Sequence, residues 1–318
     1  MHFLPRFKSQ QPRSKKRWLR FRLRTLLVVL TMTCMWLGWL VHGVQQQRRA
    51  AAKAEKFNAY IVYHSFAMVP PWTDIVPPRM CGRIESLLPS NDWRRLTRVS
   101  IQTPEFKDEH ISMFRGLPHL THVCLPATGL TNAGLKQLAD LHLRSLTVLD
   151  LSGTKITDAG LAHIRNMSRL EILLLSGNEI AGAGLKHLSG LTNLKWLSLE
   201  DTHVTDAAIK QLPSLPKLEE LHLDRTDVTG ACLTNLSAIQ SLRMLDLGGT
   251  KVCGQELSNL ARFRKLEVVI LNDTPVSDSD VKYLQNARQI VALWINGTAI
   301  SDEFVRKLPN AKQRFRRL

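Results

Sequence analysis

Apolar residues recur along residues 96–313 with a period of 24 residues, interrupted by one spacing of 26. In every unit, positions 1, 4, 6, 11, 16, 19 and 22 are apolar. Positions 4 and 6 alternate with their neighbours as in a strand, whereas positions 16, 19 and 22 follow the helical period. Each unit is therefore predicted to form a short strand, a turn and a short helix, and stacking is needed to bury its apolar face. The nine units begin at Leu96, Leu120, Leu146, Leu170, Leu194, Leu218, Leu242, Leu266 and Ile290.

Polar residues between strand and helix support this division. Position 12 is Thr or Ser in most units, and such a side chain accepts a hydrogen bond from the open N–H groups at a helix start. Asp at position 13 suits the positive end of the helix dipole. The residues concerned are Thr131, Thr157, Thr205, Thr229, Ser277 and Ser301 at position 12, and Asp158, Asp206, Asp278 and Asp302 at position 13.

The pattern LxxLxLxxTxITDAGLxxLxxL resembles the leucine-rich repeat family, in its bacterial subclass with 24-residue units, over residues 96–313. The resemblance implies an α/β solenoid that is curved, with a parallel sheet on the concave face and short helices on the convex face. It also implies protein or peptide binding. The family's Asn at position 9, which bonds the backbone of neighbouring turns, occurs here as Asn178, and Thr stands in most other units. A ladder of these Thr residues is expected to serve likewise.

The charge of the chain is concentrated at the N-terminus. The chain has 43 Lys and Arg against 27 Asp and Glu, a net charge of +16. Residues 1–50 carry eleven basic and no acidic residues, whereas residues 96–313 carry 23 of each. A nucleic-acid-binding domain would need a basic folded surface, so we predict no nucleic-acid partner.

Residues 25–44 form an uncharged, largely apolar run preceded by nine basic residues. Twenty residues of helix span about 30 Å, the thickness of the hydrocarbon core of a bilayer. We therefore predict a transmembrane helix, with residues 1–24 as a basic cytosolic tail. The repeats would lie outside the cytosol, on the periplasmic side of a bacterial inner membrane. A cleaved signal peptide is the alternative, but no small-residue cleavage site directly follows the run.

Residues 45–95 are predicted to be a juxtamembrane linker and N-terminal cap. The helix could continue to Met68, where the proline pairs at 70–71 and 77–78 would end it. Residues 83–88 are expected to form a short capping helix over the first repeat. Residues 314–318 form a basic C-terminal tail.

The candidate binding site is the outer face of the predicted sheet. If positions 4 and 6 point inward, positions 3, 5 and 7 point outward. Position 3 forms a mostly apolar row, and acidic residues gather at positions 7 and 8. Contiguous exposed apolar side chains are typical of protein interfaces, although side-by-side packing across the sheet would also explain the row. The predicted partner-binding residues are Val148, Ile172, Trp196, Glu200, Asp201, His222, Asp224, Met244, Asp246 and Val268.

Other functions have weaker support in the sequence. Ser198, His222 and Asp246 share position 5 of successive units, which makes a serine-hydrolase triad geometrically conceivable. No Gly-x-Ser-x-Gly motif accompanies it, so we predict a non-enzymatic scaffold without cofactor or metal. A soluble adaptor of the ubiquitin-ligase receptor type is an alternative that the predicted anchor disfavours. Cys232 and Cys253 could form a disulfide outside the cytosol, but the sequence leaves their pairing open.

Overall fold

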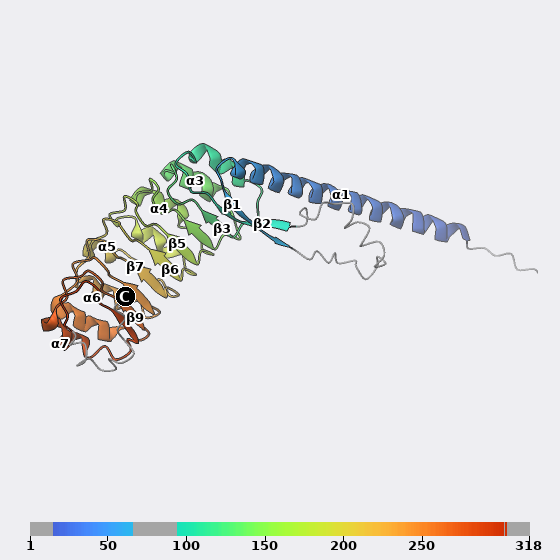
Figure 1. Ribbon diagram of the computed structural model, residues 1–318. Helices are drawn as coiled ribbons and strands as arrows, with labels where there is room; N and C mark the ends of the chain where they lie inside the picture. The colour runs from blue at the N-terminus through green and yellow to red at the C-terminus, as the bar shows by residue number, and fades with distance from the viewer. Residues whose placement is uncertain (1–14, 66–93, 302, 304–318) are drawn as a thin grey trace, which may run out of the picture. The chain divides into compact units, whose positions relative to one another are not determined.

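The computed structural model describes residues 15–65, 94–301 and 303, and divides the chain into two compact units, Met1–Gln46 and Gln47–Leu318 (Figure 1). Helix α1 (Lys15–Glu55) begins in the first unit and ends in the second. The predicted transmembrane residues 25–44 lie within α1. Among the residues that the structure describes, no helix is both long enough and apolar enough to cross a membrane.

The second unit begins with the end of α1, which does not continue to Met68 as the sequence suggested. The helix ends at Glu55, Asn58 adopts a left-handed conformation with φ 50°, and strand β1 (Tyr60–Ser65) follows. A left-handed residue commonly terminates a helix and turns the chain. The predicted capping helix at residues 83–88 lies outside the described residues.

A cap over the first repeat is nevertheless built, from other residues. Strand β1 pairs antiparallel with β2 (Arg94–Ser100), the first strand of the repeats. Ala50 and Ala54 of α1 are buried in the common hydrophobic core, and the ring of Phe57 packs edge-on against that of Phe106 at 5.4 Å. These side chains cover the end of the core that would otherwise face water.

The strands of the repeats form a continuous sheet along one face of the second unit (Figure 1). They follow one another in chain order, and they run parallel from β2 onward. Each strand beyond β2 covers positions 3 to 5 of its unit, and like positions pair, as in Trp196 with Glu220 and Glu220 with Met244. This confirms the predicted parallel sheet. The strands are β3 (His122–Cys124), β4 (Val148–Asp150), β5 (Ile172–Leu174), β6 (Trp196–Ser198), β7 (Glu220–His222), β8 (Met244–Asp246), β9 (Val268–Ile270) and β10 (Ala292–Trp294).

Short helices lie on the other side of the core. The predicted short helices are present in the first eight units, and three of these units form a 3₁₀ helix alone. These three units have Lys107, Ala181 or Cys253 at position 12, so they lack the Thr or Ser acceptor that would cap an α-helix. The helices are η1 (Asp108–Phe114), α3 (Asn132–Asp140), α4 (Asp158–Ile164), η2 (Leu185–Gly190), α5 (Asp206–Ile209), α6 (Cys232–Leu236), η3 (Gly254–Arg262), η4 (Asp278–Asp280) and α7 (Val281–Leu284).

Asn178 ties neighbouring repeats together at position 9, whereas the Thr residues do not form the expected ladder. The Asn178 amide donates to the carbonyls of Leu151 and Leu175 at 2.8 and 2.9 Å, and its oxygen accepts from the Ile156 N–H at 3.0 Å. Each Thr hydroxyl donates to the position-6 carbonyl of its own unit, as Thr202 does to Leu199 at 2.5 Å. Thr154 also reaches the following unit, because its hydroxyl lies 2.8 Å from Asn178 Oδ1.

Position 13 supplies a second connection between repeats. The Asp206 carboxylate accepts from both the N–H and the hydroxyl of Thr229 in the next unit, at 3.0 and 2.7 Å. Asp108 accepts in the same way from Thr131. Thus the Asp predicted to complement a helix dipole also bonds the helix start of the following repeat.

Replacing Asn178 with Ala should destabilise the chain more than replacing Thr202 with Ala. Asn178 is 3% exposed and serves two units, so its loss leaves buried backbone groups of both without partners. We expect a loss of about 2–4 kcal/mol for Asn178→Ala and about 1 kcal/mol for Thr202→Ala. Urea unfolding of the two variants measures both. An equal loss of unfolding free energy in both variants would show that Asn178 stabilises the repeats no more than Thr202 does.

Candidate functional site

The predicted apolar row lies across the sheet as expected. Val148, Ile172, Trp196, Met244 and Val268 occupy the same position of β4, β5, β6, β8 and β9. All five are half-buried rather than fully exposed, because each packs beside its neighbours on the adjacent strands. The outer surface of β2–β10, formed by positions 3, 5 and 7, is called the sheet face below.

Trp196 and His222 form the aromatic centre of the sheet face. Their rings stack at 5.2 Å between centroids and 12° between planes, from adjacent strands. The indole Nε1 of Trp196 and the imidazole Nε2 of His222 are both buried without a hydrogen-bond partner. Buried polar nitrogens without partners are uncommon in folded proteins, so this pair distinguishes the centre of the sheet face from the rest of it.

The acidic residues predicted beside this centre are linked by Arg225, which the sequence analysis did not select. Arg225 pairs with Glu200, with Asp201 at 2.7 Å and with Asp224 at 3.1 Å. Arg225 and Asp201 lie at position 8, where the chain is left-handed, with φ 52° and 51°. This turn conformation brings the side chains of successive turns together, so Arg225 partly neutralises the negative charge of Glu200, Asp201 and Asp224.

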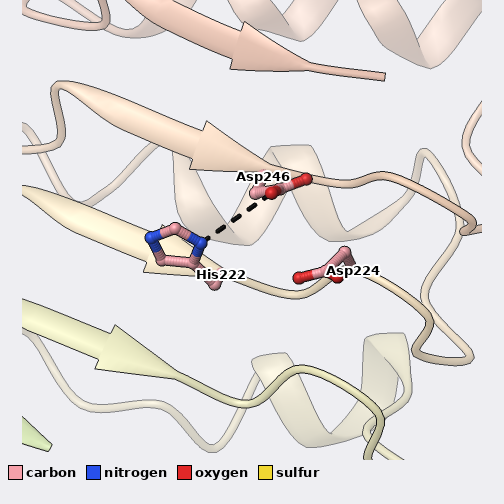
Figure 2. Close-up of side chains that lie close together, drawn as sticks. All are labelled: His222, Asp224 and Asp246. Atoms are coloured by element: carbon pink, nitrogen blue, oxygen red, sulfur yellow. Dashed lines mark ion pairs between the residues drawn. The ribbon is translucent and has the colours of Figure 1, made fainter. Parts of the chain in front are cut away.

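Three of the predicted residues converge beside Arg225 on β7, β8 and the turn after β7. His222 Nδ1 lies 3.8 Å from Asp246 Oδ2, and one ligand atom from each of His222, Asp224 and Asp246 lies within 4.8 Å of the others (Figure 2). The Gly248 N–H donates to Asp246 Oδ1 at 2.9 Å and holds this carboxylate in place. Glu220 approaches the other side of the imidazole, at 3.9 Å from Nε2.

The crowding of carboxylates shifts two pKa values upward. Burial, together with the charges of Asp246 and Glu200, raises the pKa of Asp224 to about 6, against the lowering effect of Arg225. Burial alone would lower the pKa of His222, but the carboxylates of Asp246, Asp224 and Glu220 outweigh it and raise that pKa. The cluster is therefore a site of excess negative charge that attracts a proton or another cation.

Ser198 does not complete a catalytic triad. Its hydroxyl is hydrogen-bonded to that of Ser176 at 2.7 Å, and Ser198 is 5% exposed. The nucleophile of a hydrolase must reach its substrate and be activated by the imidazole. The shared position in the repeat thus brings His222 to Asp246 but directs Ser198 to a different partner.

The two cysteines whose pairing the sequence left open are both free thiols. Cys232 is fully buried at the start of α6, and burial raises the pKa of its thiol, with a further rise from Asp206. A buried thiol with a raised pKa is unreactive.

Comparison with known protein families agrees with the fold and with the repeats in the sequence. Residues 144–204 match the family model for the leucine rich repeat. Residues 144–204 therefore contain leucine-rich repeats, and the 24-residue units and the parallel sheet continue the same pattern on either side of them. No curated protein sequence matches the chain significantly.

Solved structures similar to this chain include two bacterial proteins. Internalin C2 of Listeria monocytogenes is 24% identical, with a TM-score of 0.47 and coverage of 78% of this chain and 96% of the other. A leucine-rich repeat protein of Leptospira interrogans is 21% identical, with a TM-score of 0.45 and coverage of 62% and 48%. A third structure, TLR13 in complex with ssRNA13, is 16% identical, with a TM-score of 0.48 and coverage of 66% and 30%. At these identities and TM-scores, none of the three assigns a ligand to this chain.

Sequence reasoning missed Arg225 and Glu220 as parts of the site. Glu220 shares position 3 with the apolar row, and as the one charged residue at this position between Val148 and Val268 it was a usable signal. Arg225 had a weaker signal, since position 8 varies among Thr, Ala, Gly, Asp and Arg. The left-handed turn that directs its side chain occurs with Ala, Gly, Asp and Arg alike.

The raised pKa of Asp224 predicts a pH-dependent effect of Asp224→Asn. The folded chain holds the proton more tightly than the unfolded chain, so Asp224 costs stability that grows as pH rises from about 4 to about 6. We expect Asp224→Asn to raise the free energy of unfolding relative to the parent at pH 7, with a smaller gain at pH 4. Urea unfolding in buffer without divalent cations measures the difference.

Asp227→Asn provides a control of opposite sign. A hydrogen bond and the charge of Lys251 lower the pKa of Asp227, so this carboxylate contributes stability that is lost as pH falls. The variant should be slightly less stable than the parent at pH 7, with the gap closing at low pH. A pH-independent effect of Asp224→Asn would contradict the electrostatic account.

Proposed function

We propose that the chain is a non-enzymatic scaffold of the bacterial 24-residue repeat subclass whose sheet face binds a protein or peptide. The observation that carries the proposal is the row of half-buried apolar side chains at position 3, which includes the Trp196 ring stacked on His222 and is interrupted at β7 by Glu220. Solenoids present extended surfaces of this kind to their partners. Aromatic residues and Met are enriched at interfaces, where Trp in particular contributes much of the binding energy.

The charges around this row favour a protein over a nucleic acid. Residues 96–313 balance to zero, and Glu200, Glu220, Asp224 and Asp246 outnumber the basic residue Arg225 around the aromatic centre. A phosphate backbone would be repelled there. An extended segment with apolar side chains could instead lie along the row and meet several strands at once.

Photo-crosslinking from the sheet face should identify the bound surface. We expect a crosslinkable residue at position 148 or 244 of the full chain to give a discrete adduct in cells, because these positions lie in the row. Trp196→Ala should weaken that adduct by about tenfold or more, as expected for an aromatic hot spot. The matched control is a crosslinker at position 186, which is exposed on η2 on the helical side.

Two outcomes would contradict the proposal. One is an adduct from position 186 but none from positions 148 and 244. The other is an adduct from the sheet face that Trp196→Ala leaves at full intensity while the variant retains its unfolding midpoint.

We further propose that residues 25–44 anchor the chain in a membrane, with the N-terminus in the cytosol and the repeats on the periplasmic side of a bacterial inner membrane. Large apolar side chains of this run are solvent-exposed on α1, among them Leu27, Leu30, Met35 and Trp39 at 54, 57, 64 and 62%. A helix that exposes apolar residues in water is unfavourable unless another apolar medium covers it. The nine preceding basic residues favour a cytosolic N-terminus.

Charged substitutions within this run should release the chain from membranes. We expect the full chain to stay in the membrane pellet after alkaline extraction, and Met32→Lys with Met35→Lys to shift most of it to the supernatant. Lysine near the middle of a span costs about 2.5–3.5 kcal/mol. Gln45→Lys with Gln46→Lys adds the same charge beyond the apolar run and should change nothing.

The predicted orientation needs its own test. Protease added to cells with a permeabilised outer barrier should digest the repeats while sparing residues 1–24. Repeats that stay protected under these conditions, or a parent chain that alkaline extraction removes from the pellet, would argue against the anchored arrangement.

A further inference from the structure

We propose that His222, Asp224 and Asp246 bind a divalent transition-metal ion of the Zn²⁺ type on the sheet face. This inference does not rest on the proposed partner, although His222 belongs to both sites. Among the residues that the structure describes, these three form the one group of at least three His, Cys, Asp or Glu side chains with the spacing of metal ligands.

The geometry of the cluster suits a small cation. Its ligand atoms lie within 4.8 Å of one another, and His222 Nδ1 lies 3.8 Å from Asp246 Oδ2. Ligand atoms at the usual Zn²⁺ distances in a tetrahedral site are separated by about 3.4 Å. Small side-chain rotations would therefore bring the three atoms to coordination distance, and the backbone could stay in place.

The fold holds these side chains in position. His222 and Asp246 share position 5 of the paired strands β7 and β8, so the sheet register places them side by side (Figure 2). Asp224 follows two residues after His222 and projects to the same side of the chain. Because the Gly248 N–H engages Asp246 Oδ1, the Oδ2 atom is the one directed at His222.

The donor set indicates the class of ion. One imidazole nitrogen with two carboxylates suits Zn²⁺ and its neighbours among the transition metals, whereas Mg²⁺ and Ca²⁺ prefer oxygen ligands throughout. His222 Nδ1 and Asp246 Oδ2 are too far apart for a hydrogen bond, so they do not satisfy each other directly. A shared cation would satisfy both.

Arg225 is a cation that already lies beside the cluster, but its guanidinium does not take the position between His222 and Asp246. Its guanidinium lies 3.1 Å from Asp224 Oδ2 but also pairs with Glu200 and Asp201, so its charge is divided among three carboxylates. Asp246 and Glu220 form ion pairs with the His222 imidazole and not with Arg225. The local balance of these groups is negative, which favours an added cation.

Calorimetric titration of the chelator-treated full chain with Zn²⁺ tests the site. The expected result is one Zn²⁺ bound per chain in detergent, with His222→Ala and Asp246→Asn each weakening binding at least about tenfold. Mg²⁺ should not compete. The matched control is His187→Ala, which removes an imidazole from η2 on the helical side and should bind Zn²⁺ like the parent.

A stability measurement keeps the test decisive if His222→Ala does not fold. Zn²⁺ should raise the unfolding midpoint of the parent and of His187→Ala, because it binds the folded state, and should not raise that of His222→Gln. Absence of stoichiometric binding by the parent overturns the proposal, as does binding that survives in His222→Ala or His222→Gln. Loss of Zn²⁺ binding in His187→Ala alone would place the ion elsewhere and also overturn it.

Discussion

The parallel hydrogen bonding of three-residue strands is the constraint on which the rest of this structure depends. Each strand pairs with the next at like positions, so a side chain lies beside its counterparts in the units before and after it. Adjacent strands are about 4.8 Å apart, within reach of direct side-chain contact. Residues 24 apart in the sequence therefore become neighbours in space, and a functional site can be assembled from one residue in each of several units.

This constraint explains which features the sequence could predict. The apolar positions of each unit are fixed by burial, and Leu197, Leu221 and Leu245 at position 4 are all completely buried. Such repetition determines the strands, the core and the neighbour relation of His222 and Asp246. The first cap was not predictable in the same way, because β1 and the end of α1 occur once and lie outside the period. The repeat pattern thus followed from periodicity, while the cap before the first repeat required the structure.

The side chains of the site were harder to predict because several partners compete for each of them. Ser198 shares a position with His222 yet bonds Ser176 on the opposite side. Arg225 reaches back to the turn of the preceding unit, which depends on a left-handed backbone that Ala, Gly, Asp and Arg all adopt here. Sequence position tells which residues are adjacent, whereas rotamers and turn geometry decide which of the adjacent groups bond.

The same division separates the core from the sheet face that we propose to bind a partner. Positions that fill the core cannot vary without losing packing energy, so they carry little information about a partner. Positions 3, 5, 7 and 8 are released from that requirement, and along them the sheet face changes from aliphatic at Val148 and Ile172 to aromatic and ionic at Trp196, His222 and Asp246. The charged groups occur where an apolar surface would be equally compatible with the fold. Half-buried carboxylates repel one another and cost stability, so their concentration over two adjacent units is the observation on which the proposed cation site rests.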